Sequence, residues 1–205
     1  MTRRAIIAQL SRLKSDDTGA TIVEFALVSP VLMLLLMGLF DLAYNMYTNE
    51  MLNGAVQQAA RNATVEGAAG RQQEIDAGVT RAIRAVAPGA TMTFNRRFYA
   101  GFSDVNRPED WDDIDGNGTC DNGELFEDAN GNGIWDANAG ADGIGGARDA
   151  VLYSVTIDYP RMFPVYSFLP GQSNTFSLTA NTVLRNQPFG AQQVSQNPTT
   201  GNCTA

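Results

Sequence analysis

The stretch GATIVEFALVSPVLMLLLMGLFDLAY, residues 19–44, decides how the rest of the chain can fold. It is an apolar run in which Glu24 and Asp41 are the only charged residues, and a bilayer is crossed by about 20 such residues. The run is longer than the apolar core of a signal peptide, and no A-x-A cleavage site follows it. We therefore expect a transmembrane helix over residues 20–45, in preference to the buried core helix of a soluble protein.

A carboxylate at Glu24 is costly inside a membrane unless a positive charge answers it. Cleavage after Gly19 would place a new amino group on Ala20, one helical turn from Glu24 and on the same face. We therefore predict a leader over residues 1–19. Bases cluster before the helix and predict a cytoplasmic N-terminal side, with the chain after residue 45 on the periplasmic or extracellular side. These bases are Arg3, Arg4, Arg12 and Lys14.

Several positions in this region together form a recognisable pattern. They are Gly19-Ala20-Thr21-Ile22-Val23-Glu24-Phe25-Ala26-Leu27, Pro30, Gly38 and Ala59-Ala60-Arg61. Over about residues 15–65 the chain resembles the TadE family, the pseudopilins of tight-adherence (Flp-type IV) pilus systems. The resemblance implies cleavage after Gly19 by a prepilin peptidase, with Glu24 fifth in the mature chain. Phe25 stands where the major Flp pilins usually carry Tyr, which favours a minor pseudopilin.

The resemblance also implies partners and a location. The partners are the prepilin peptidase, other pilins and pseudopilins, and the inner-membrane secretion platform. The location is the inner membrane, as a single-pass protein, or the pilus itself. Whether such a subunit caps, initiates or only assists the pilus is left open by the sequence.

Composition narrows the classes of function further. The chain has 205 residues, no His and a formal charge of −8, which becomes −10 when the four bases and two acids of residues 1–19 are removed. Because no basic patch is available to neutralise phosphates, we expect no nucleic-acid partner. The lack of His excludes imidazole catalysis, and no G-x-S-x-G or P-loop motif is present. We therefore expect that the protein is not an enzyme.

The exported part has the pattern of a small α+β domain. Apolar residues at helical spacing between residues 51 and 63 extend the first helix, and we favour packing on the protein's own sheet over contact with another subunit. A second helix is expected between Ile75 and Val86. Alternation predicts three strands of an antiparallel sheet, at residues 92–98, 151–159 and 176–184. The expected segments are 46–103, the insert 104–149, the sheet-completing 150–186, and a flexible tail over 187–205.

The insert carries 13 acids and two bases, and it contains a metal-binding pattern. DIDGNGTCDNGE, residues 113–124, satisfies the calcium-loop pattern D-x-[DN]-x-[DN]-G-x5-E. Calcium takes about six to eight oxygen ligands, and alternate residues of a tight loop present them to one point. The predicted ligands are Asp113, Asp115, Asn117, the Thr119 carbonyl, Asp121 and Glu124.

A second copy of the loop starts 15 residues later. Its predicted ligands are Asp128, Asn130, Asn132, the Ile134 carbonyl and Asp136. Its twelfth position is Ala139, so we expect Glu127 or Asp142 to substitute for the missing acid. The alternative is an acidic, Gly-rich loop whose Asp-Gly and Asn-Gly pairs mark ordinary turns.

No clear helix signal flanks the first loop, which is therefore unlike a full EF-hand. The insert is similar to the tandem loops of dockerin-like and thrombospondin-repeat modules. That likeness implies structural calcium. A small apolar cluster is expected to support the loops, made of Trp111, Ile114, Leu125, Phe126, Ile134 and Trp135. Cys120 and Cys203 either form one disulfide in an oxidising compartment or are two unrelated thiols.

Together these features predict a TadE-like minor pseudopilin that acts in pilus assembly and surface adhesion. One alternative is a membrane-anchored, calcium-stabilised surface binding protein (an adhesin), which would keep residues 1–19. A second is a membrane-anchored enzyme, whose polar pocket the sequence does not reveal.

Overall fold

A computed structural model describes residues 19–63, 68–168, 170–186 and 199–204. The chain divides into two compact units. The first contains residues 1–45 and 161–174, and the second contains residues 46–160 and 175–205. The predicted leader lies outside the described residues except for Gly19.

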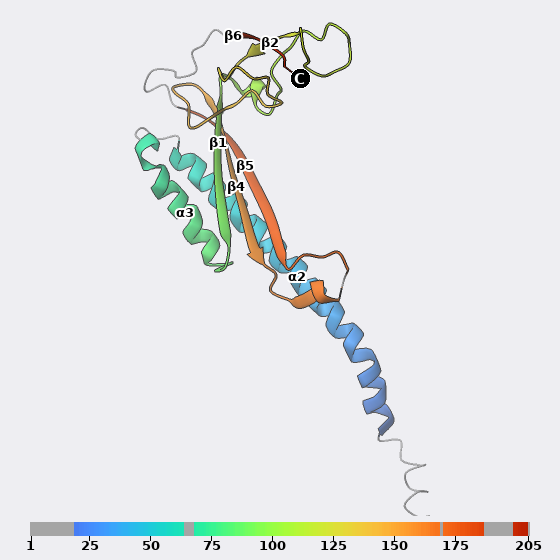
Figure 1. The fold of residues 1–205 in the computed structure, drawn as a ribbon. Helices are drawn as coiled ribbons and strands as arrows, with labels where there is room; N and C mark the ends of the chain where they lie inside the picture. The colour runs from blue at the N-terminus through green and yellow to red at the C-terminus, as the bar shows by residue number, and fades with distance from the viewer. Residues whose placement is uncertain (1–18, 64–67, 169, 187–198, 205) are drawn as a thin grey trace, which may run out of the picture. The chain divides into compact units, whose positions relative to one another are not determined.

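Helix α2, Ala20–Ala63, is a single helix of 44 residues that includes Pro30 (Figure 1). It is long and apolar enough to cross a membrane, and none of its most apolar stretch is buried. The predicted N-terminal apolar helix is therefore confirmed, and it is compatible with a single-pass membrane anchor. The first unit also contains a loop, residues 161–174, with the short 3-10 helix η4, Pro164–Ser167.

The second unit is built on a four-stranded antiparallel sheet in the order β3-β1-β4-β5. Its long strands are β1, Thr91–Tyr99; β4, Ala150–Pro160; and β5, Thr175–Arg185. These are the three strands that alternation predicts. The fourth, β3, has two residues, Ala141–Asp142, and comes from the acidic insert. The insert thus contributes an edge to the main sheet.

The C-terminal half of α2 packs on this sheet. Leu52 and Val56 are buried, and Ala60 forms a cluster with Val151 of β4 and Leu184 of β5. The predicted packing of this stripe on the protein's own sheet is confirmed.

Helix α3, Gln72–Arg84, is the predicted second helix, and it buries Val79 and Ile83. A polar cluster fixes it to the sheet. Asp76 forms an ion pair with Arg96 of β1 and accepts a hydrogen bond from the Tyr153 hydroxyl at 2.8 Å. Burial raises the pKa of Tyr153, and the hydrogen bond to Asp76 acts in the same direction. The Asp76 charge on α3 is therefore matched by Arg96 of the sheet.

The C-terminal segment departs from the predicted flexible tail. Residues 187–198 lie outside the described part, but β6, Thr199–Asn202, pairs antiparallel with β2, Leu125–Asp128. Cys203 is 2% exposed and is bonded to Cys120, with 5.4 Å between the two Cα atoms. The prediction of a flexible tail is wrong for residues 199–203, because strand pairing and the disulfide hold a polar sequence that has little core of its own.

Candidate metal centre in the acidic insert

The first acidic loop folds its backbone around Asp113. The amide of Gly116 donates to Oδ1 of Asp113 at 2.8 Å, and the amide of Gly118 donates to Oδ2 at 3.0 Å. Both glycines have positive φ, +73° and +76°, which other residues adopt only with strain. As a result, carboxylate oxygens of Asp113, Asp115 and Glu124 all lie within 4.8 Å of one another.

The remaining predicted ligands of this loop also lie together. The Asn117 side chain donates to Asp115 at 2.9 Å and to Asp121 at 2.8 Å. Its oxygen accepts the Thr119 amide at 2.7 Å, which fixes the main chain at the seventh loop position. The structure therefore brings together the residues that the sequence pattern selects.

The second loop repeats this geometry position by position. Asp128 accepts the amides of Gly131 at 2.7 Å and Gly133 at 2.8 Å, and these glycines have φ of +77° and +80°. Asn132 donates to Asp136 at 2.6 Å. The other two predicted positions, Asn130 and Ile134, donate respectively to Asp136 and to Asn132, both at 2.7 Å.

A glutamate closes each loop in the same way. Glu124 accepts backbone amides from the second and ninth residues of the first loop, at 2.8 and 3.2 Å. Glu109 accepts backbone amides from the second and ninth residues of the second loop, at 2.9 and 3.0 Å. Glu109 is thus the structural counterpart of Glu124, although it precedes its loop in the chain.

Sequence reasoning missed Glu109 and named Glu127 or Asp142 as the closing acid. Both of these side chains are exposed, and Asp142 pairs with Arg97 at 3.4 Å. The signal that was available is the repeat itself. Glu109 stands four residues before Asp113, as Glu124 stands four residues before Asp128, so the 15-residue repeat includes the glutamate.

The two repeats are related by a local pseudo-twofold arrangement. The Asp112 amide donates to the Leu125 carbonyl at 2.8 Å, and the equivalent Glu127 amide donates to the Asp110 carbonyl, also at 2.8 Å. Trp111 and Phe126, at equivalent positions, form an isolated antiparallel bridge between these hydrogen bonds. Because of this pairing, the glutamate of each repeat closes the loop of the other.

Three carboxylates of the two loops are almost fully buried, where a negative charge is costly unless a cation or hydrogen bonds compensate it. Glu109 is 1% exposed, Glu124 3% and Asp128 4%. Burial raises the pKa of Glu109, and the nearby Asp128 charge acts in the same direction, while hydrogen bonds from backbone amides oppose both. Among the described residues, no Arg forms an ion pair with any of these three acids. An all-oxygen, negatively charged donor set of this kind fits a hard divalent cation such as calcium.

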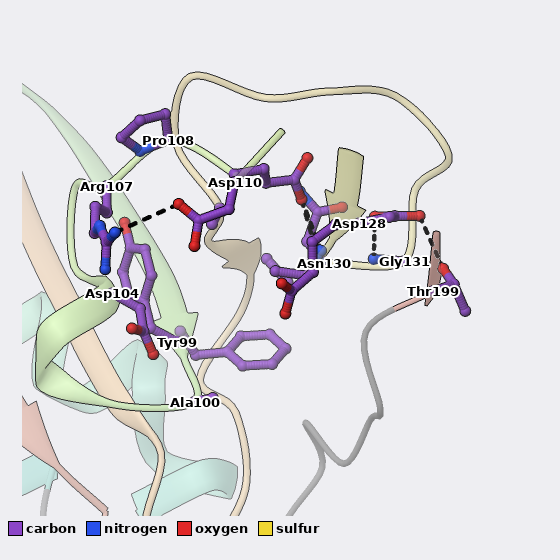
Figure 2. Close-up of a pocket in the computed structure, with 16 residues that line it drawn as sticks. Tyr99, Ala100, Asp104, Arg107, Pro108, Asp110, Asp128, Asn130, Gly131 and Thr199 are labelled. Carbon is purple, nitrogen blue, oxygen red and sulfur yellow. Dashed lines mark hydrogen bonds and ion pairs between the residues drawn. The ribbon is translucent and has the colours of Figure 1, made fainter. Parts of the chain in front are cut away.

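A pocket of about 470 Å³ borders the second loop. Figure 2 shows Asp128 between the Gly131 amide and the Thr199 hydroxyl, and Arg107 beside Asp110 at the other side. Five carboxylates line this pocket, against the single Arg107. The lining gives the approach to the second loop a negative potential, which favours cations.

The apolar support of the loops differs from the prediction. Phe126 is 2% exposed, and the rings of Trp111 and Trp135 meet edge to face at 5.2 Å. The prediction was wrong for three members, since Ile114, Leu125 and Ile134 are largely exposed. Hydrogen bonds and the Cys120–Cys203 bond therefore carry more of the fold here than an apolar core does.

The residues predicted for processing lie at the start of α2. Gly19 immediately precedes the helix, Ala20 is its first residue, and Glu24 is exposed one turn later. The described structure thus has a single apolar helix that begins at the predicted cleavage point and leads into an α+β unit. This arrangement is the one expected of a membrane-anchored pilin-like subunit.

A comparison with protein families supports that class. The model of the family described as TadE-like protein matches residues 19–61. This segment is therefore TadE-like, which associates the protein with tight-adherence pilus systems and with the membrane. No curated protein and no solved structure shows a significant match to the chain.

Proposed function

We propose that the protein is a minor pseudopilin of a tight-adherence pilus, processed after Gly19, with an exported domain that calcium stabilises. The observation that carries the proposal is the family match over residues 19–61, which includes Gly19, Glu24 and the exposed apolar helix. The segment outside the match supplies the features particular to this chain. The protein acts through contacts with other proteins and in surface adhesion, not through catalysis.

Cleavage after Gly19 would give the Glu24 carboxylate a positively charged partner. A new amino group on Ala20, of the same or a neighbouring subunit, lies one helical turn away and neutralises the carboxylate within the apolar layer. Partners in this function are the prepilin peptidase, other pilins and the inner-membrane secretion platform. The second unit then lies on the periplasmic or extracellular side, where calcium is abundant.

Two calcium ions would complete the insert. The first loop would hold its ion with Asp113, Asp115, Asn117, Asp121 and Glu124, and the Thr119 carbonyl would add a ligand. The second would use Asp128, Asn130, Asn132, Asp136 and the Ile134 carbonyl, with Glu109 as the closing carboxylate. Glu109 and Asp128 are buried and form no ion pair with a base in the part of the chain that the structure describes, and this supports the calcium sites. The ions would be structural, since they compensate buried charge in a region with little apolar core.

The proposal is tested by intact-mass and N-terminal analysis of the chain isolated from its native membranes. We expect a mature N-terminus at Ala20. We also expect Glu24→Ala to be cleaved but not incorporated into pili, while Glu50→Ala, an exposed acid further along α2, is incorporated normally. An N-terminus at Met1 in cells with active peptidase contradicts the proposal and favours a membrane-anchored surface binding protein.

A further inference from the structure

The loop between β4 and β5 presents large apolar side chains to solvent. Within residues 161–174, here called the membrane-proximal loop, Met162 is 59% exposed, Phe168 57% and Tyr166 36%. Leu39 and Phe40 of α2 are each 56% exposed. An apolar surface of this kind marks a binding site for a partner or a membrane.

The loop is fixed to α2 by a buried ion pair. The Arg161 guanidinium binds Asp41 of α2, and both side chains are largely buried. The same guanidinium donates to the Ser173 carbonyl at 3.1 Å and to Gln172 at 3.2 Å, which closes the base of the loop. These contacts hold the membrane-proximal loop against α2, beside which it runs in Figure 1.

An aromatic contact joins the loop to the same turn of α2. The rings of Phe163 and Phe40 stack with their centroids 6.1 Å apart. An α-helix rises about 1.5 Å per residue, so Phe40 lies roughly 30 Å along the axis from Ala20. This distance is about the thickness of the hydrocarbon core, so a span that starts at Ala20 ends at Phe40.

The charges of the loop also suit a membrane surface. Between Arg161 and Asn174 the sequence has no acidic residue, and its one base is paired with Asp41. The acidic insert, in contrast, carries 13 acids. The loop can therefore approach anionic headgroups without repulsion, and a tyrosine such as Tyr166 favours that interfacial layer.

We propose that the membrane-proximal loop lies in the membrane interface, on the side where α2 leaves the bilayer, with Met162, Tyr166 and Phe168 inserted among the lipids. The occupant of this surface is the bilayer that α2 crosses, because the loop contacts the exposed apolar helix through the stacking of Phe163 on Phe40. The loop gives the subunit a second attachment to the bilayer beside its helix. The inference rests on the membrane placement of α2 in the proposed function.

The test is tryptophan quenching by brominated lipids, with the full-length chain in liposomes at a low protein-to-lipid ratio. Phe168→Trp reports on the loop, and Leu35→Trp reports on the span itself. Phe102→Trp is the matched control, since it is 53% exposed but lies in the second unit. The wild-type emission, from Trp111 and Trp135, is subtracted as the baseline.

We expect lipids brominated near the headgroup to quench the Phe168→Trp emission, at a depth of about 5–10 Å, and to leave Phe102→Trp unchanged. Lipids brominated deep in the acyl chains should quench Leu35→Trp. Quenching of Leu35→Trp without any quenching of Phe168→Trp overturns the loop proposal and leaves the span standing. Quenching of Phe168→Trp that is absent at a high protein-to-lipid ratio and appears only on dilution also overturns it, since a second copy of the chain then covers the loop in the crowded bilayer. A lack of quenching of Leu35→Trp overturns the membrane placement of α2, on which both the loop proposal and the proposed function depend.

Discussion

Glu109→Gln is the substitution that discriminates best between a calcium site and an acidic turn in the second loop. The side chain is 1% exposed and accepts the amides of Ala129 and Asp136 through separate oxygens. Gln keeps one acceptor and places an NH2 group against the Asp136 amide, which costs about 1–3 kcal/mol. It also removes a buried negative charge beside Asp128, which offsets part of that cost. Without calcium, the free energy of unfolding should therefore change little.

With calcium, the same substitution should have a large effect. Extracellular calcium modules bind with dissociation constants of about 10⁻⁴ to 10⁻³ M. At about 10 mM calcium, each filled site would then add about 1.4–2.7 kcal/mol to the free energy of unfolding. Loss of the second site should lower the melting temperature by about 3–10 °C, in calcium only.

The assay is thermal denaturation of the full-length chain in detergent, with calcium and with chelator, supported by calorimetry of calcium binding. We expect two sites in the wild type and one in Glu109→Gln. Glu127→Gln is the matched control, because Glu127 is an exposed acid that immediately precedes the second loop. The assignment of Glu109 would be refuted if calcium raised the melting temperature of Glu109→Gln as much as that of the wild type. It would also be refuted if Glu127→Gln lost this calcium-dependent increase. The lack of any calcium effect on the wild type would refute the calcium proposal as a whole.

Three further substitutions test the fold. In urea titrations, Asp76→Asn should lower the free energy of unfolding by about 2–3 kcal/mol, because it breaks a largely buried ion pair. Glu74→Gln, which breaks an exposed ion pair, should change it by less than about 0.5 kcal/mol. Gly201→Ala places a Cβ against the buried Phe126 ring and should cost about 1–3 kcal/mol in thermal denaturation. Gly54→Ala, in an open helical position, should stabilise the protein in the same assay. Cys203→Ser should cost about 2–5 kcal/mol and match the reduced wild type, and equal stability of oxidised and reduced protein would contradict a structural role for the disulfide.

Much of the fold could be predicted because its signals are local. A continuous apolar run gave α2, helical spacing gave α3, and alternation gave β1, β4 and β5. The clustering of the predicted ligand side chains within each loop was likewise predictable, since alternate residues of a short loop face one point. The small strands β2, β3 and β6 were not predicted, because runs of only two to four residues are too short to carry a periodic signal.

Glu109, the glutamate that closes the second loop, was not predicted for a different reason. Glu109 lies 27 residues before Asp136, whose amide it binds, so no local pattern connects the two. Repeat symmetry was the signal that could have found it. Extending the 15-residue period back from Glu124 reaches Glu109.

The sequence by itself determined the apolar helix, the identity of the calcium-loop pattern and the α+β class, because each depends on residues close together in the chain. Only the tertiary structure decided that each repeat closes the loop of the other, and that Cys203 joins Cys120 across 83 residues. It also decided that Arg161 fixes an apolar loop to Asp41, 120 residues earlier. These contacts depend on where the chain reverses, and that is set by the packing of the whole domain, which no local sequence pattern specifies.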